Sequence, residues 1–276
     1  MQQIISAQIP FNSNKIFNHH KHYPPLHVII PAYNESRSII SVINRIETSL
    51  ISHFLEYRIT VIDDGSTDST YELLKNSRKN ISLVKNRKNL GKGRTLRKGI
   101  LQSKKDELVV VIDGDGEHLP EDISRLVQPI ISGNAEFVIG SRFLPKNAES
   151  SIVGSYLKNQ KKFSHFRKMG NNLISFLIYT LFHRKITDSQ CGFRAFAPNI
   201  AKYYIPSYSG FEIETEMTIF YILNNFKICE VPIDTGLNTR ESHMNIFKDS
   251  LKILFVILSM RFRKTRLANN SLRKEF

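Results

Sequence analysis

The chain contains an apolar run that ends in two aspartates, Leu108-Val109-Val110-Val111-Ile112-Asp113-Gly114-Asp115. Valine and isoleucine favour extended backbone, so the run predicts a buried strand. Functional residues of a parallel α/β sheet gather at the carboxyl ends of its strands. Two aspartates there repel each other unless a cation neutralises them, and Mg²⁺ or Mn²⁺ bound to a substrate diphosphate is such a cation. The same pattern also occurs in solvated turns before a helix, and alone it does not decide between the two.

Three further segments strengthen the metal interpretation. They are Val28-Ile29-Ile30-Pro31-Ala32-Tyr33-Asn34-Glu35, Val61-Ile62-Asp63-Asp64-Gly65-Ser66-Thr67-Asp68 and the glycine-rich turn Asn89-Leu90-Gly91-Lys92-Gly93. Each has a local explanation as a cap or a turn, but capping does not predict that successive strand ends all carry polar residues. We expect strands at residues 26–31, 57–63, 82–85, 107–113 and 135–140, and helices at 37–52, 69–76, 92–102 and 121–131. This alternation predicts an α/β fold with a mostly parallel sheet.

The rest of the chain changes character. Residues 144–170 are polar and basic and predict a mobile loop, followed by a helix at 212–223 and a strand at 227–232. We divide the chain into a flexible N-terminal tail (1–25), one catalytic domain (26–245) and a C-terminal helix with a basic tail (246–276). The two cysteines do not suggest a disulfide scaffold, which is compatible with a reducing cytosol.

The net charge of +14 requires an anionic partner, either nucleic acid or anionic lipid and phosphorylated substrates. Basic residues concentrate at 158–168 and 261–274, beside apolar runs at 173–182 and 251–260. Both runs are shorter than the roughly 20 residues that span a bilayer. They describe buried core helices or helices that lie in a membrane interface. No aromatic stacking motif for RNA or DNA is present, so no nucleic-acid partner is expected.

In their order along the chain, the motifs resemble inverting family 2 glycosyltransferases of the GT-A fold. The resemblance rests on Pro31-Ala32-Tyr33-Asn34-Glu35, Asp63-Asp64-Gly65-Ser66-Thr67-Asp68, Asp113-Gly114-Asp115 and Gly140-Ser141-Arg142. Three later segments resemble the dolichyl-phosphate (polyprenyl-phosphate) mannosyl- and glucosyltransferases. These are Asp188-Ser189-Gln190-Cys191-Gly192-Phe193-Arg194-Ala195-Phe196, Gly210-Phe211-Glu212-Ile213-Glu214-Thr215-Glu216-Met217 and Glu230-Val231-Pro232-Ile233.

The resemblance implies a Rossmann-like, mostly parallel sheet flanked by helices, with C-terminal helices that are interfacial or packed on the domain. It implies metal-dependent, inverting transfer of mannose or glucose from GDP-mannose or UDP-glucose to a dolichyl or polyprenyl phosphate. The protein would then lie peripherally on the cytoplasmic face of a membrane. Two alternatives stay open: a family 2 transferase with a saccharide or other soluble acceptor, and a non-catalytic nucleotide-binding module.

The resemblance also assigns roles to donor-site residues. Asp113, Asp115 and Glu117 match positions that hold Mg²⁺ or Mn²⁺ against the donor diphosphate. The nucleotide would contact the chain at five further positions, which are Pro31, Tyr33, Glu35, Gly114 and Asp64, together with the backbone at Ile62.

The acceptor phosphate is already an anion and needs placement more than a strong base. Arginine binds phosphate oxygens bidentately, which makes Arg142, Arg167 and Arg240 candidates for holding it. Glu216 matches an acidic family position, where we expect a positioning role. The final basic loop departs from the family pattern, because His243 stands where lysine is common. The expected catalytic set is therefore Asp113, Asp115, Glu216 and Arg240.

Overall fold

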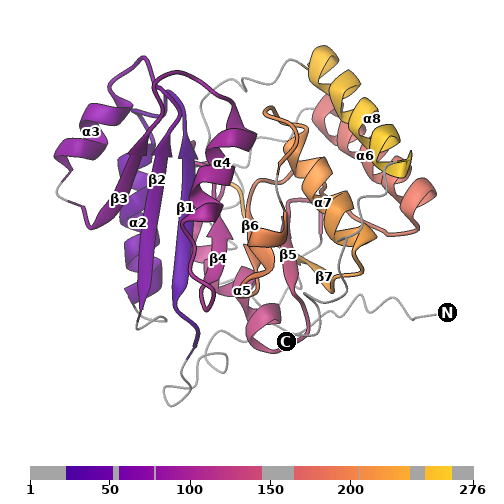
Figure 1. Ribbon diagram of the computed structural model, residues 1–276, viewed down its shortest axis with the longest axis horizontal. Coiled ribbons are helices and arrows are strands. Elements are labelled where there is room, and N and C mark those ends of the chain that lie inside the picture. Colours follow the sequence, from indigo (N-terminus) through magenta and orange to yellow (C-terminus); the bar gives the residue numbers. More distant parts are fainter. Residues whose placement is uncertain are drawn as a thin grey trace.

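The computed structural model describes residues 23–51, 56–77, 79–144, 165–204, 206–236 and 246–262 (Figure 1). Its strands are β1 (Leu26–Ala32), β2 (Tyr57–Asp63), β3 (Ile81–Lys85), β4 (Leu108–Val111), β5 (Phe137–Ser141), β6 (Arg194–Phe196) and β7 (Ile228–Pro232). Its helices are α2 (Ile39–Ile51), α3 (Thr70–Asn76), α4 (Lys92–Leu101), α5 (Ile123–Ile131), α6 (His165–Phe182), α7 (Ile213–Leu223) and α8 (Ile246–Phe262). Two 3₁₀ turns, η1 (Pro120–Asp122) and η4 (Ile200–Tyr203), complete the elements.

The strands form one sheet in the order β3-β2-β1-β4-β6-β5-β7. Strand β1 lies between β2 and β4, and Leu26 is in register with Tyr57 on one side and Leu108 on the other. All neighbouring pairs are parallel except those of β6, which runs antiparallel to both β4 and β5. The carboxyl ends of β2, β1 and β4 therefore meet at one edge, as the sequence predicted.

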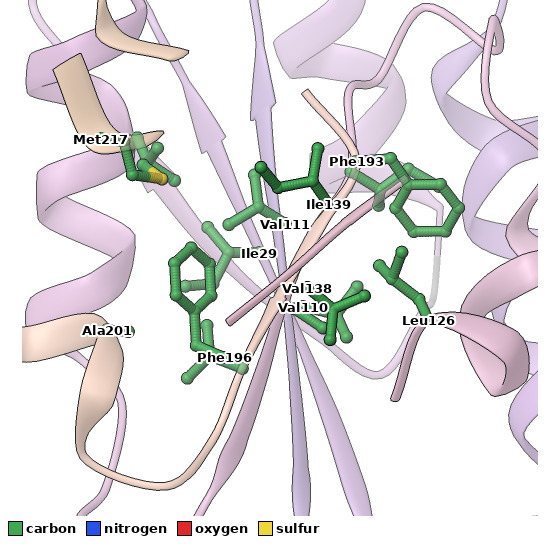
Figure 2. Close-up of a cluster of buried hydrophobic side chains, with 14 of the residues drawn as sticks. Ile29, Val110, Val111, Leu126, Val138, Ile139, Phe193, Phe196, Ala201 and Met217 are labelled. Carbon is green, nitrogen blue, oxygen red and sulfur yellow. The ribbon is translucent and has the colours of Figure 1, made fainter. Parts of the chain in front are cut away.

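Helices cover both faces of the sheet, which is why the central strand β4 is apolar and buried at every position. Helix α5 packs on β4, β5 and β6 from one face, and Figure 2 shows its Leu126 near Val110 and Val138. Helices α4 and α7 cover the other face, where Tyr221 of α7 stacks on Phe137 with 4.5 Å between the ring centroids. Helices α6 and α8 lie side by side beyond α7 (Figure 1).

A buried polar cluster lies at the opposite end of the sheet, where β1 begins. His27 is fully buried; its Nδ1 is 2.9 Å from Ser103 Oγ and its Nε2 is 2.7 Å from Thr60 Oγ1. Arg58 Nη2 lies 3.0 Å from the same Nδ1. A guanidinium can only donate, so Nδ1 accepts and the ring is neutral. Burial, followed by the charge of Arg58, lowers the pKa of His27 from 6.5 to about 3.

The predicted strands and helices up to residue 140 are confirmed, with small shifts at their ends. The helix at 212–223 and the strand at 227–232 are confirmed as α7 and β7. The prediction of a loop over 144–170 is wrong at its end, because α6 already begins at His165. The polar composition of that stretch concealed an apolar stripe, starting at Met169, that continues into the helix. Strand β6 was not predicted, since three residues beginning with arginine carry no period-2 pattern.

Candidate functional site

The loops after β1 and β2 are tied together at the carboxyl edge of the sheet. The Asn34 side chain accepts a hydrogen bond from the backbone N–H of Thr67 at 2.8 Å, and the Asn34 backbone donates to Ser66 Oγ at 2.9 Å. Asn34 adopts a positive φ of 57°, which asparagine tolerates better than most residues. The predicted donor-binding segments of β1 and β2 therefore form one continuous surface.

The predicted nucleotide contacts differ in accessibility. Pro31 and Ile62 are buried and in register in neighbouring strands, so a ligand would meet mainly their backbone. Tyr33 and Glu35 are half-buried just beyond the end of β1. The structure thus brings all four residues to one edge of the sheet.

Asp64 anchors the glycine-rich turn. Its two carboxylate oxygens accept hydrogen bonds from the backbone N–H groups of Leu90 and Gly91, both at 2.9 Å, and from Asn86 Nδ2 at 2.7 Å. Asp64 is 3% exposed. Sequence reasoning placed Asp64 at the nucleotide base, but it did not foresee that Asp64 fixes the turn that opens α4.

A second loop closes over the same turn. The backbone N–H of Gly93 donates to the Ser209 carbonyl at 2.9 Å, and a Cβ added to Gly93 would collide with the Tyr208 carbonyl oxygen. Glu216 holds this 206–210 loop, because it accepts hydrogen bonds from Tyr204 Oη at 2.7 Å and from the Ser207 N–H at 3.1 Å. The predicted catalytic residue Glu216 is 4% exposed and directed at the loop.

Asp113 is bound by a lysine that sequence reasoning did not select. Lys92 Nζ lies 2.8 Å from Asp113 Oδ1 and 2.6 Å from Glu214 Oε1. Burial disfavours the charged form of each group, but this pairing outweighs it. The pKa of Asp113 is therefore lowered, and the pKa of Lys92 is raised above its usual range. Lys92 in the glycine-rich turn and Glu214, two residues before Glu216, were visible signals, but nothing local in the sequence joins them.

Glu117, the last acid of the motif, pairs with Arg142. Arg142 Nη1 donates to Glu117 Oε1 at 2.8 Å, and Arg142 Nε donates to Asp188 Oδ2 at 2.7 Å. Burial opposes the charge of Arg142, yet Asp188 dominates and raises the pKa of the guanidinium. Burial, followed by the charge of Asp113, raises the pKa of Asp115 to about 7. Arg142 is thus positioned as an anchor for Glu117.

This arrangement has an excess of negative charge that suits a divalent cation. The negative charges of Asp113, Glu117 and Glu35 each raise the pKa of Asp115, because they disfavour a further anion beside them. Mg²⁺ and Mn²⁺ prefer carboxylate oxygens, so the residue types fit either ion. No group of three or more His, Cys, Asp or Glu side chains within the described ranges is already arranged around a metal position. Asp113, Asp115 and Glu117 are therefore not grouped as three ligands of one ion in this structure.

The side chains of two predicted phosphate-binding arginines are not among those that the structure describes. Arg240 lies outside the described residues, and Arg167 falls in the first turn of α6, where only the backbone is described. His243 also lies outside them. Their proposed contacts with an acceptor phosphate stay predictions.

A large apolar surface lies on α6 and α8, and we call it the apolar helix face. It holds nine of the twelve exposed large hydrophobic side chains of the described residues: Met169, Leu173, Phe176, Tyr179, Leu251, Leu254, Phe255, Leu258 and Phe262. Both helices bury an opposite stripe, which includes Ile178 and Ile257. No helix among the described segments is long and apolar enough to cross a membrane.

The apolar helix face is connected to the glycine-rich turn. Tyr208, in the loop that covers that turn, has its hydroxyl 3.2 Å from Ser259 Oγ of α8. Helix α8 also packs on α7, which carries Glu214 and Glu216. Helix α8 therefore contacts both the loop over the glycine-rich turn and the helix that carries Glu214 and Glu216.

Comparisons with known proteins agree on one family. A family model described as glycosyl transferase family 2 matches residues 27–191. The UDP-N-acetylglucosamine–dolichyl-phosphate N-acetylglucosaminyltransferase of Methanococcus voltae is 31% identical over 232 residues, which cover 76% of this chain and 85% of that protein. The dolichyl-phosphate beta-glucosyltransferase of Dictyostelium discoideum is 28% identical over 253 residues, 86% of this chain and 74% of that protein.

A solved structure shares the fold. The glucosyl-3-phosphoglycerate synthase of Mycobacterium tuberculosis, in complex with Mn²⁺, UDP and phosphoglyceric acid, has a TM-score of 0.66 and 20% identity to this chain. The match covers 87% of this chain and 79% of that one. At this identity the likeness concerns the arrangement of helices and strands.

Proposed function

This chain belongs to glycosyl transferase family 2 and has the GT-A fold, and on that premise we propose that it transfers a sugar from a nucleotide diphosphate sugar to a polyprenyl phosphate at a membrane surface. One observation carries the proposal: the acidic site and the apolar helix face are joined within one domain through Tyr208 and Ser259. A nucleotide sugar requires the first and a lipid-borne acceptor requires the second. The relatives named for dolichyl-phosphate acceptors support the same pairing.

We propose that Asp113, Asp115 and Glu117 serve a Mg²⁺ or Mn²⁺ ion together with the donor diphosphate. The charge excess around Asp115 supports this, as does Mn²⁺ in the related solved structure. When bound, such an ion stabilises the charge that develops on the departing diphosphate. The chain's own part is to hold the acids apart, through Lys92 at Asp113 and Arg142 at Glu117.

For the nucleotide, we propose contacts at the end of β1 and in the loop after β4. Tyr33 and Glu35 are half-buried and accessible enough to meet it directly, while the buried Pro31, Ile62 and Gly114 would contribute backbone groups. Asp64 would act by holding the glycine-rich turn against the ligand.

For the acceptor, we propose that the polyprenyl phosphate oxygen attacks the sugar directly, because it is already ionised. Arg167 and Arg240 remain the proposed phosphate ligands. Arg142 would act by positioning Glu117, and Glu216 by positioning the 206–210 loop, since both are engaged in those contacts.

We propose that the apolar helix face lies in the membrane interface. Its side chains recur at helical spacing, as Met169, Leu173 and Phe176 do on α6, and contiguous exposed apolar surface of this kind marks an interaction site. Exposed Lys168, Lys252 and Arg261 on the same two helices would lie among lipid phosphates. The protein would then bind the membrane peripherally, on the cytoplasmic face where nucleotide sugars are available.

The experiment that tests the proposal also selects the sugar. We would incubate the purified chain with Mn²⁺, a short polyprenyl phosphate and one of three labelled donors: UDP-N-acetylglucosamine, UDP-glucose or GDP-mannose. UDP-glucose and GDP-mannose are the donors expected from the sequence. UDP-N-acetylglucosamine is added because the relative from Methanococcus voltae is named for it. Label in the organic phase from one donor, abolished by EDTA, is the expected result.

Two other outcomes would count against the proposal. Label appearing only in a water-soluble product would replace the lipid acceptor by a soluble one. Nucleotide-sugar binding without transfer to any acceptor would favour a non-catalytic module.

A further inference from the structure

Lys92 is enclosed between two acids at the centre of the site. Its Nζ is 2.8 Å and 2.9 Å from the two carboxylate oxygens of Asp113 and 2.6 Å from Glu214 Oε1. Only 19% of its side chain is exposed. The ammonium therefore occupies the space directly in front of the first acid of the Asp-x-Asp pair.

Close backbone approaches hold the lysine in this position. Gly93 follows it in the chain and donates its N–H to the Ser209 carbonyl at 2.9 Å. On the other side, a Cβ added to Gly192 would collide with Asp113 Oδ2 and lie 2.9 Å from Lys92 Nζ. Lys92 is thus packed as part of the site, unlike the exposed Arg97 on the same helix.

We propose that Lys92 is a resident counter-ion of Asp113 that competes with a divalent cation for this carboxylate, so that the protein alone binds such a cation weakly. The inference rests on the proposed function, in which a metal and Asp115 act together. An ammonium at 2.8 Å occupies the lone pairs that a metal would use, and it repels a second cation. Arg142 has the same relation to Glu117 at 2.8 Å.

The pairing leads to opposite effects in two variants. In Lys92→Met the ammonium is lost and Asp113 becomes available, so the affinity for Mn²⁺ without nucleotide should rise on the order of tenfold. In Glu214→Gln the lysine loses its second acid and stays with Asp113, so the same affinity should remain low or fall. If Lys92 only supported the fold, both substitutions would lower Mn²⁺ binding.

The measurement is Mn²⁺ binding by electron paramagnetic resonance, on the full chain at pH 7.5, with and without UDP. Wild type should bind Mn²⁺ weakly alone and at least about tenfold more tightly with UDP, whereas Lys92→Met should bind Mn²⁺ tightly in both conditions. Arg97→Met removes one positive charge from the exposed side of α4 and controls for net charge. Circular dichroism melts verify folding, and Lys92→Gln replaces the methionine variant if that variant unfolds.

The outcomes separate the inference from the function on which it rests. An unchanged or weaker nucleotide-free affinity in the folded Lys92 variant would overturn the counter-ion role alone, provided that wild type binds Mn²⁺ with UDP. A rise equal to that of Arg97→Met would also overturn it. Wild type that fails to bind Mn²⁺ even with UDP would overturn both the counter-ion role and the metal-dependent function.

Discussion

Replacing His27 by glutamine should remove one contribution to the acid sensitivity of this fold. His27 is buried as a neutral ring between Ser103, Thr60 and Arg58, and its pKa is lowered to about 3. In the unfolded chain the ring titrates near its usual pKa of 6.5. The unfolded state therefore binds a proton that the folded state excludes. The contribution of His27 to stability is complete above pH 6.5 and is lost as the pH falls toward 3.

The two pKa values determine the size of the effect. Between pH 8 and pH 5, protonation of the unfolded chain should lower the free energy of unfolding by about 2 kcal/mol through this one residue. Urea unfolding at pH 5, 6, 7 and 8, followed by circular dichroism, measures it. The free energy of unfolding of wild type should exceed that of His27→Gln by about 2 kcal/mol less at pH 5 than at pH 8. The same substitution at the exposed His183 serves as the control for exchanging an imidazole for an amide. If the difference in free energy of unfolding between the two proteins stays constant with pH, His27 is protonated as readily in the folded state as in the unfolded chain, and the reasoning is refuted.

Three other predictions concern the site and the membrane. Asp115→Asn should abolish transfer without lowering the melting temperature at pH 8. The pKa of Asp115 is raised to about 7, so the ionised side chain destabilises the folded state at pH 8. A variant that fails to fold would contradict this prediction. Phe255→Ser removes about 1–2 kcal/mol of apolar transfer free energy and should weaken vesicle binding roughly tenfold, whereas Leu101→Ser, on α4, should not change vesicle binding. Glu216→Gln should raise the donor KM several-fold with little change in kcat, and a collapse of kcat alone would instead make Glu216 a catalytic base.

The fold was largely predictable because its strong signals are local. Each strand from β1 to β5 is a short β-branched or apolar run that ends in polar residues, and each following helix repeats its apolar residues at helical spacing. Strand β6 was not predicted because its partners β4 and β5 lie far away in sequence, and a three-residue strand shows no pattern of its own. The start of α6 was not predicted because its first turn contains His165, Arg167 and Lys168, and the apolar spacing begins only at Met169.

The site was predictable in its residue types and less so in its pairings. The acids at 113, 115 and 117 follow β4, so their place at the carboxyl end of the sheet could be inferred from parallel topology alone. Which cation faces which acid depends on side chains that approach from α4 and from the loop before β6. Lys92 and Asp188 could therefore be identified only once the backbone had brought them within 3 Å of Asp113 and Arg142.

The antiparallel β6 has a consequence for the order in which the protein is made. Strands β3, β2, β1 and β4 are contiguous in space and complete once residue 111 has left the ribosome. Strand β5 then has no neighbour, because β6 separates it from β4 and β7 covers its other edge. An apolar strand must wait for more than fifty further residues, from Ser141 to Arg194, before its first partner is synthesised. We expect this interval to be when the nascent chain is most exposed to aggregation and most dependent on chaperones.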